Sequence, residues 1–269
     1  MASIAITASP QPGGGLRAAL GGYSPLARLY RRFRPRWLWR ATSPFGPSTS
    51  RYVSENGLTV KRGPFEGMVF IDEAVGKANH LSPKLIGSYE PDVADFLGEQ
   101  APEHDLFVDL GSGEGFFCVG VARLSPSRVI GFELNRYERR LSKRIAAANG
   151  VEAETRGRVD HDGLNSLPPG RLLLLSDIEG LEEDLLDPVA VPRLKEATMI
   201  VEVHEQFRPD VVATLSERFG PTHHLEHFAA GEPRPEDYPE LAAWDSDEAK
   251  WAVFDGHLPG QGWMSFIPR

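Results

Sequence analysis

The sequence is almost free of cysteine. Cys118 is the only one in 269 residues, so no internal disulfide can form. The sequence also has no apolar run near the roughly 20 residues that span a bilayer. Its first residues lack the charged start and long apolar core of a secretory signal. These absences predict a protein of a reducing compartment, and we expect it in the cytoplasm.

Positive charge is scarce outside the N-terminus. The net charge is −9, which argues against a general nucleic-acid binder, and we expect no nucleic-acid partner. Residues 1–62 nevertheless carry ten Lys or Arg and one acid, so the remaining residues carry −18. Residues 1–57 are predicted to form a basic, partly disordered arm with an Arg-rich stretch around Trp37 and Trp39. Such an arm could contact an anionic membrane, fold back on the acidic body, or serve as a transit peptide.

A glycine-rich turn lies near the middle of the chain. An apolar strand, Leu106 to Leu110, runs into Gly111-Ser112-Gly113-Glu114-Gly115, and a helix is predicted from Glu114 to about Leu124. A second apolar strand then ends on Glu133. Glycine leaves room for a ligand against the backbone, and the start of a helix presents N–H groups that suit an anion.

Two ligand types use such a turn. A dinucleotide requires G-x-G-x-x-G, whereas this chain has G-x-G-x-G preceded by Asp109, which would repel a pyrophosphate. S-adenosylmethionine fits better, because Asp109 can pair with its ammonium group and amides around Gly113 with its carboxylate. Glu133 can accept the ribose hydroxyls. Three neighbouring residues complete this end of the predicted cofactor site: Gly111, Ser112 and Leu134.

The remaining pattern predicts an α/β fold. A helix is expected over 136–149 and strands over 151–159, 171–176, 198–203, 223–228 and 262–267. Together these give a Rossmann-like, seven-stranded, mostly parallel sheet with helices on both faces and a closing antiparallel pair. Residues 58–104 are predicted to hold a hairpin (58–71) and lid helices, and residues 105–269 the cofactor-binding domain. An acidic insert at about 231–255 is long enough to be functional or to hold a short helix.

Polar residues follow the predicted core strands. In an open parallel sheet, ligands bind beyond the carboxyl ends of the strands. The residues at these ends are Asp109, Glu133, Asp160 with Asp162, Asp177 with Glu179, and His204 with Glu205. Asp160 or Asp162 would accept the adenine amino group. Asp177, at the central crevice, belongs to both the cofactor site and the place where methyl donor and acceptor meet.

With these residues the sequence resembles the class I S-adenosylmethionine-dependent methyltransferases, and within them the FkbM family. The general resemblance rests on 108–115 and on Phe132-Glu133; the narrower one rests on Asp177-Ile178-Glu179-Gly180-Leu181-Glu182 and on 200–204. The family motif usually has a Lys two residues before its Asp, where this chain has Leu175. The resemblance implies O-methylation of a hydroxyl on a sugar or glycolipid, a polyketide or a related small molecule.

The predicted catalytic residues are His204, Asp177 and Glu179. An alcohol gains from a base that takes its proton, and His204 or Asp177 could be that base. Asp177 and Glu179 could instead hold a divalent cation, which the sequence does not favour, so we assign no metal ligands. Two other functions stay open. One is a non-catalytic S-adenosylmethionine-binding interaction module, and the other, less favoured, is a nicotinamide-dependent oxidoreductase.

Overall fold

The structure is a computed structural model that describes residues 45–76, 80–257 and 261–269. The predicted basic arm lies outside the described residues over 1–44. Within the described residues, no helix is both long and apolar enough to cross a membrane.

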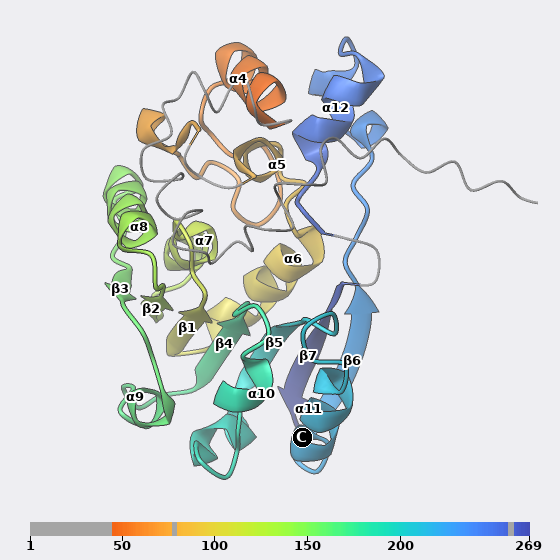
Figure 1. Cartoon of the computed structure of the whole chain (residues 1–269). Coiled ribbons are helices and arrows are strands. Elements are labelled where there is room, and N and C mark those ends of the chain that lie inside the picture. The colour runs from red at the N-terminus through yellow and green to blue at the C-terminus, as the bar shows by residue number, and fades with distance from the viewer. Residues whose placement is uncertain (1–44, 77–79, 258–260) are drawn as a thin grey trace, which may run out of the picture.

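A seven-stranded sheet forms the centre of the molecule (Figure 1). Its strands are β1 (Leu106–Leu110), β2 (Arg128–Phe132), β3 (Glu154–Arg156), β4 (Leu172–Ser176), β5 (Thr198–Val203), β6 (His223–Ala229) and β7 (Gly262–Pro268). The order is β3-β2-β1-β4-β5-β7-β6. The first five strands are parallel, and β7 is antiparallel to both β5 and β6. The predicted fold class is confirmed.

Helices cover both faces of this sheet. The helices α6 (Pro91–Gln100), α7 (Phe116–Leu124) and α8 (Arg136–Ala148) pack over one face, where Phe107 and Leu173 join their core. The other face, with Val108 and Leu174, is covered by α9 (His161–Asn165), α10 (Glu182–Leu185) and α11 (Val211–Phe219). Alternate residues of β1 and β4 enter opposite cores, which explains why both sequences are almost entirely apolar.

A third group of helices lies beyond α6 and α7. It consists of α4 (Phe45–Asn56), α5 (Leu81–Ile86) and α12 (Ser246–Val253), with α12 in contact with both α4 and α5 (Figure 1). We predicted no helix over 45–56. Its Gly, Pro, Ser and Thr residues are weak helix formers, but Tyr52 is fully buried, so tertiary packing stabilises the helix. The short helix expected in the acidic insert is present as α12.

Several boundaries differ from the sequence prediction. The expected 58–71 hairpin is a single antiparallel bridge between Thr59 and Val69, and β3 has only three residues. The helix α7 begins at Phe116 rather than Glu114, because Gly115 adopts a left-handed φ of 87° before it. Short 3-10 helices occupy Asp72–Ala74, Ala101–Glu103, Pro192–Glu196, Pro235–Asp237 and Pro239–Leu241.

Candidate active site

The glycine turn packs directly against the loop that follows β4. The Asp177 amide donates to the Leu110 carbonyl at 2.9 Å, and Gly111 lies against the Asp177 carbonyl. A Cβ on Gly111 would stand 1.8 Å from that oxygen, and the Gly111 φ is +95°. Gly113, by contrast, has open space around its Cβ position. Gly111 is therefore required for packing against Asp177, and Gly113 is the glycine that leaves room for a ligand.

Glu133 lies over the glycine turn. Its carboxylate accepts from the Gly113 amide at 3.0 Å and from the Asn135 amide at 2.6 Å. The Gly113 amide, predicted to hold the cofactor carboxylate, is thus already used by Glu133. Leu134 beside it is 64% exposed, so its side chain is available to an apolar ligand surface. Ser112 is buried, and its hydroxyl has no hydrogen-bond partner among the described residues.

Asp109 is buried beneath the turn. Its carboxylate accepts a hydrogen bond from the Cys118 thiol at 3.3 Å. Burial raises the pKa of Asp109 to about 7; the Cys118 hydrogen bond opposes this rise and the charge of Glu133 adds to it. Asp109 is therefore a carboxyl group that a nearby cation would ionise.

Lys84 brings a cation to the same end of α7. It forms a buried ion pair with Glu114, and its ammonium lies 4.4 Å from the ring centroid of Tyr89. Sequence reasoning missed Lys84, because it lies in the lid region, far from the glycine turn in sequence. Its ammonium can bind a carboxylate that the Gly113 amide no longer holds.

Asp160 and Asp162 lie at the far side of this region, at the start of α9. Both are exposed, and Asp160 caps the helix by accepting from the Gly163 amide at 2.9 Å. Its second oxygen remains available to a ligand.

His204 follows β5 and is the centre of a carboxylate cluster. Its Nδ1 lies 2.7 Å from Oε1 of Glu182, which is fully buried. Its Nε2 faces Asp177 Oδ1 at 3.6 Å and Glu179 Oε2 at 3.7 Å. Glu202 Oε2 is 3.5 Å from the same nitrogen. The three predicted catalytic side chains are thus brought together at the ends of β4 and β5.

The cluster perturbs the ionisation of its members. Burial lowers the pKa of His204, but the Glu182 hydrogen bond and the surrounding carboxylates outweigh it, so this pKa is raised. Burial and then Glu202 raise the pKa of Asp177 well above its usual range. The pKa of Glu202 is lowered despite its burial, because His257 and Asp177 hydrogen-bond to it. A raised pKa favours imidazolium, which works against His204 as a base in this state.

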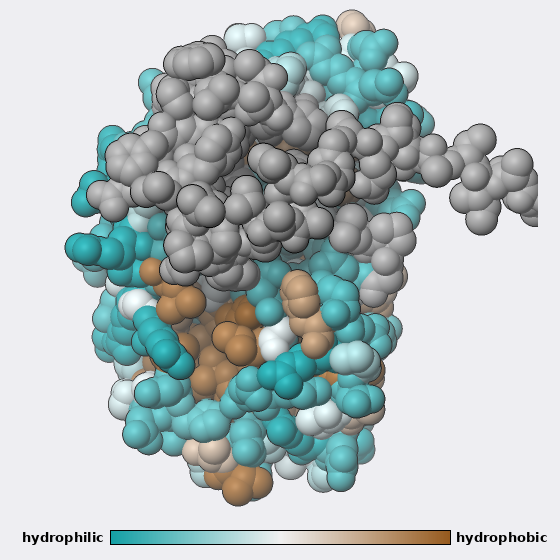
Figure 2. All heavy atoms as spheres, in the orientation of Figure 1, coloured by the Kyte–Doolittle hydropathy of each residue, from teal (hydrophilic) through white to brown (hydrophobic). Residues whose placement is uncertain are grey.

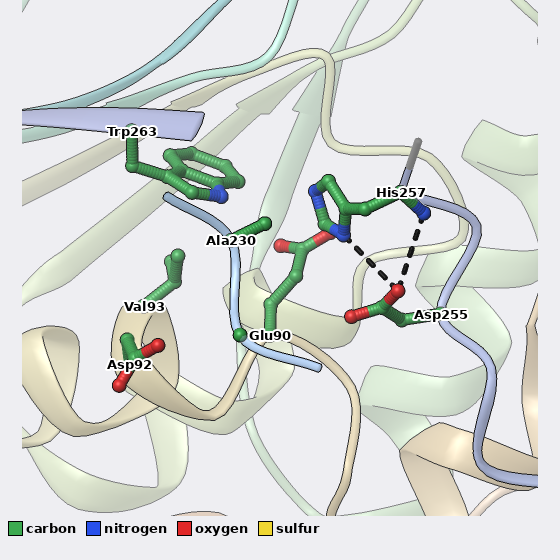
Figure 3. Close-up of a pocket in the computed structure, with 8 residues that line it drawn as sticks. Glu90, Asp92, Val93, Ala230, Asp255, His257 and Trp263 are labelled. Carbon is green, nitrogen blue, oxygen red and sulfur yellow. Dashed lines mark hydrogen bonds and ion pairs between the residues drawn. The ribbon is translucent and has the colours of Figure 1, made fainter. Parts of the chain in front are cut away.

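A second group of titratable residues adjoins the first through Glu202. Glu90 and His257 point toward one another in the lining of a small hollow of about 10 Å³, and His257 also pairs with Asp255 (Figure 3). His257 Nε2 lies 3.4 Å from Glu202 and 4.0 Å from Glu90, and its Nδ1 lies 3.1 Å from Asp255.

These contacts shift both pKa values upward. Burial opposes protonation of His257, but hydrogen bonds to Asp255 and Glu202 raise its pKa to about 10. Burial and the charge of Glu202 raise the pKa of Glu90 to about 8. Glu90 also has a left-handed φ of 44°, which is uncommon for a residue other than glycine.

Sequence reasoning missed most of this second group. Glu90 lies in the region of the predicted lid helices, and Asp255 and His257 lie at the end of the insert, far from any core motif. Glu182 and Glu202 did belong to the motifs behind the family resemblance, yet received no role. A carboxylate inside an apolar strand, as Glu202 is in β5, was the available signal, because a buried charge requires a partner.

Apolar side chains are exposed near the same sheet edge. The loops after β4 and β5 expose Leu181 by 51% and Phe207 by 56%. The Phe207 ring stacks on His204 with centroids 6.0 Å apart. Figure 2 shows exposed apolar residues in the middle of this view, bordered by hydrophilic ones. The site therefore offers apolar contacts around a charged centre, as small-molecule sites do.

Comparison with known proteins gives structural similarity only. No protein-family model matches the chain, and no curated protein matches it. An rRNA methylase from Streptococcus thermophilus aligns at 12% identity and a TM-score of 0.45, covering 66% of this chain and 95% of its own. A candidate O-methyltransferase from Klebsiella pneumoniae aligns at 11% identity and a TM-score of 0.44. The alignment covers 90% of this chain and 96% of that protein.

A tRNA (uracil-54, C5)-methyltransferase from Pyrococcus abyssi, in complex with S-adenosyl-L-homocysteine, aligns at 16% identity and a TM-score of 0.44. The alignment covers 66% of this chain and 38% of the chain of that methyltransferase. At these values the similarity says nothing about a reaction or a substrate. Both have to come from the residues of the site.

Proposed function

We propose that this protein is an S-adenosylmethionine-dependent methyltransferase that methylates a hydroxyl of a small molecule, a sugar or glycolipid, or a polyketide-type acceptor. One observation carries the proposal. Gly111 packs on the Asp177 carbonyl, so the glycine turn is joined to the cluster of Asp177, Glu179 and His204. A donor bound at the turn and an acceptor bound at the cluster would be neighbours, as direct methyl transfer requires.

The cofactor is proposed to bind along the turn. Glu133, already over the turn, would accept the ribose hydroxyls, and Leu134 would cover the adenine ring with Asp160 at its amino group. Asp109 would pair with the ammonium group. Lys84 is added to the predicted set as the partner of the cofactor carboxylate, because Glu133 occupies the Gly113 amide. Each group of the cofactor then meets opposite charge or a hydrogen-bond partner.

The reaction would break the sulfur–methyl bond and form an oxygen–methyl bond, with the electron pair of the broken bond going to sulfur. The acceptor hydroxyl loses its proton in the process. His204, Asp177 and Glu179 are proposed to activate this hydroxyl. They could do so through proton acceptance by His204 or Asp177, or through a cation held by the cluster.

Calorimetric titration tests the cofactor part of the proposal. S-adenosylhomocysteine, the demethylated product, should bind in the micromolar range, about −8 kcal/mol. Glu133→Gln should weaken binding by about 1–3 kcal/mol, the cost of a lost charged hydrogen bond. Glu152→Gln, an exposed acid outside the site, is the matched control and should bind as the wild type does.

Two results would favour the other functions. Tight NADH binding without a response to S-adenosylhomocysteine would identify an oxidoreductase. Binding of S-adenosylhomocysteine without transfer from labelled S-adenosylmethionine to any of a panel of sugars, glycolipids and polyketide alcohols would favour a non-catalytic module. Label in the acceptor, released by ether cleavage but not by mild base, would support methylation of a hydroxyl over methylation of a carboxyl group.

A further inference from the structure

We propose that Asp177, Glu179 and His204 bind one divalent metal ion. The sequence assigned no metal ligands, but the fold places a ligand atom of each residue within 4.8 Å of the others. Two carboxylate oxygens and an imidazole nitrogen form a mixed oxygen and nitrogen set. The proposal concerns an ion at the acceptor side of the crevice, separate from the cofactor contacts at the glycine turn.

The distances in the cluster are those of shared coordination. Charged hydrogen bonds measure about 2.7–2.9 Å, and the His204 Nδ1 contact with Glu182 has that length at 2.7 Å. On its other side, Nε2 stands 3.6 Å from Asp177 and 3.7 Å from Glu179, too long for such bonds. Two atoms that each lie about 2.1–2.2 Å from one ion are separated by roughly 3.0–3.7 Å. Each of these two pairs therefore has the spacing of two ligands on one ion, and the ligand atoms of all three residues lie within 4.8 Å of one another.

The setting of His204 supports the same conclusion. Its side chain is 2% exposed, and the buried Glu182 fixes its Nδ1. A carboxylate behind a histidine is the usual second contact of a metal-bound imidazole, because it fixes the tautomer and the ring orientation. The ring is thereby held with Nε2 toward Asp177, whose buried Oδ1 has no hydrogen-bond partner among the described residues.

The charge of the region favours a cation. Four carboxylates surround His204: Asp177, Glu179, Glu182 and Glu202. The next histidine, His257, is already shared by Glu202, Asp255 and Glu90. Even with both imidazoles charged and with Asp177 and Glu90 protonated, the carboxylates of Glu179, Glu182, Glu202 and Asp255 exceed the positive charge. Unbalanced buried charge is costly, and an ion with two positive charges reduces the excess.

One side of the proposed site is open. The side chains of Asp177 and Glu179 are 34% and 47% exposed, whereas that of His204 is closed behind them. Glu179 has a left-handed φ of 57°, which is uncommon for a residue other than glycine, and its Oε2 lies 3.7 Å from His204 Nε2. Three protein ligands with an open side leave positions for water or substrate, as in catalytic metal sites.

The role of the ion in the reaction rests on the proposed function; its binding does not. With the acceptor oxygen on the ion, the hydroxyl proton becomes more acidic and leaves to solvent as the methyl group arrives. The overall reaction converts the alcohol and S-adenosylmethionine into the methyl ether, S-adenosylhomocysteine and one proton. No oxidant or further reactant is required.

Titration of the full chain with Mn²⁺ tests the site. The free ion gives an electron paramagnetic resonance signal that weakens on binding, and no cofactor is required. We expect about one Mn²⁺ per chain, displaced by excess Mg²⁺, and at least tenfold weaker binding in Asp177→Asn and in Glu179→Gln. Both variants conserve shape, and circular dichroism checks that they fold. Glu205→Gln, an exposed acid next to His204, is the matched control and should bind as the wild type does.

Two outcomes would overturn the metal site. One is an unchanged free Mn²⁺ signal with wild-type protein up to millimolar concentration. The other is equal binding by the wild type and the Asp177→Asn, Glu179→Gln double variant. The result is separable from the reaction. A chain that binds Mn²⁺ at this site and transfers no methyl group would keep the site and remove the proposed activity. A chain that binds no Mn²⁺ and still transfers methyl groups in the presence of a chelator would keep the proposed activity and remove the metal site.

Discussion

Asp109 gives the sharpest test of the cofactor site, because its ionisation should link stability, pH and ligand binding. The residue is 2% exposed, and its pKa in the folded chain is about 7 instead of 3.8. At about 1.36 kcal/mol per pKa unit, this difference corresponds to a stability cost on the order of 4 kcal/mol once Asp109 is ionised. The carboxyl group is therefore protonated in the folded chain at pH 5 and ionised at pH 8.

The sign of the pH dependence follows from proton counting. Between pH 4 and 7 the folded chain holds a proton on Asp109 that the unfolded chain has released. Stability then falls as pH rises through this range. Asp109→Asn has no such proton. Its stability relative to the wild type should therefore improve from pH 5 to pH 8, measured as the unfolding free energy in urea at each pH.

Asp105→Asn is a control of opposite sign. Asp105 is exposed and paired with Arg171, and the hydrogen bonds from Arg171 lower its pKa. The stability it contributes is present above its unfolded pKa and lost as pH falls. Asp105→Asn should therefore lose stability relative to the wild type at neutral pH and recover in acid.

Cofactor binding should offset the free-energy cost of ionising Asp109. If its ammonium pairs with the carboxylate, binding of S-adenosylhomocysteine at pH 6 should release close to one proton. Calorimetry in two buffers of different ionisation enthalpy measures this release. Affinity should rise with pH up to about 7 and then level off. Wild type and Asp109→Asn with parallel stability profiles, and binding without proton release, would refute the assignment.

Three further predictions concern the turn, the lid and the N-terminus. Gly111→Ala should destabilise the chain by more than about 3 kcal/mol, because the new Cβ would clash with the Asp177 carbonyl. Gly113→Ala should cost only about 1 kcal/mol of stability and should mainly weaken S-adenosylhomocysteine binding. Thermal unfolding measures the stability changes, and calorimetry measures the binding. Lys84→Met should lose about 3–5 kcal/mol by leaving Glu114 unpaired; adding Glu114→Gln should restore stability but not cofactor affinity. Residues 1–44 hold seven Arg and no acid. Their removal should leave the cofactor site folded and should reduce co-sedimentation of the protein with anionic vesicles at low salt. Equal sedimentation of the full-length and shortened forms would contradict membrane contact.

The presence of the parallel strands was predictable because their signals are local. Apart from the short polar strand β3, each is a short apolar run bounded by turn residues, and connections between parallel strands are helical. Asp109 and Glu133 could be placed for the same reason, since each directly follows or ends such a run. Weak signals failed: the helix over 45–56 contains poor helix formers and exists because Tyr52 is buried by distant residues.

The sequence by itself determined which polar residues lie at the carboxyl edge of the sheet, because chain direction fixes that edge in a parallel sheet. It placed Asp177, Glu179 and His204 there without their relative positions. Only the tertiary structure decided that Glu182 orients the His204 ring and that Gly111 joins the turn to Asp177. It alone brought Glu90 and His257, 167 positions apart in the sequence, to the same buried carboxylate of Glu202. Such contacts arise from packing between elements distant in sequence, and no local spacing encodes them.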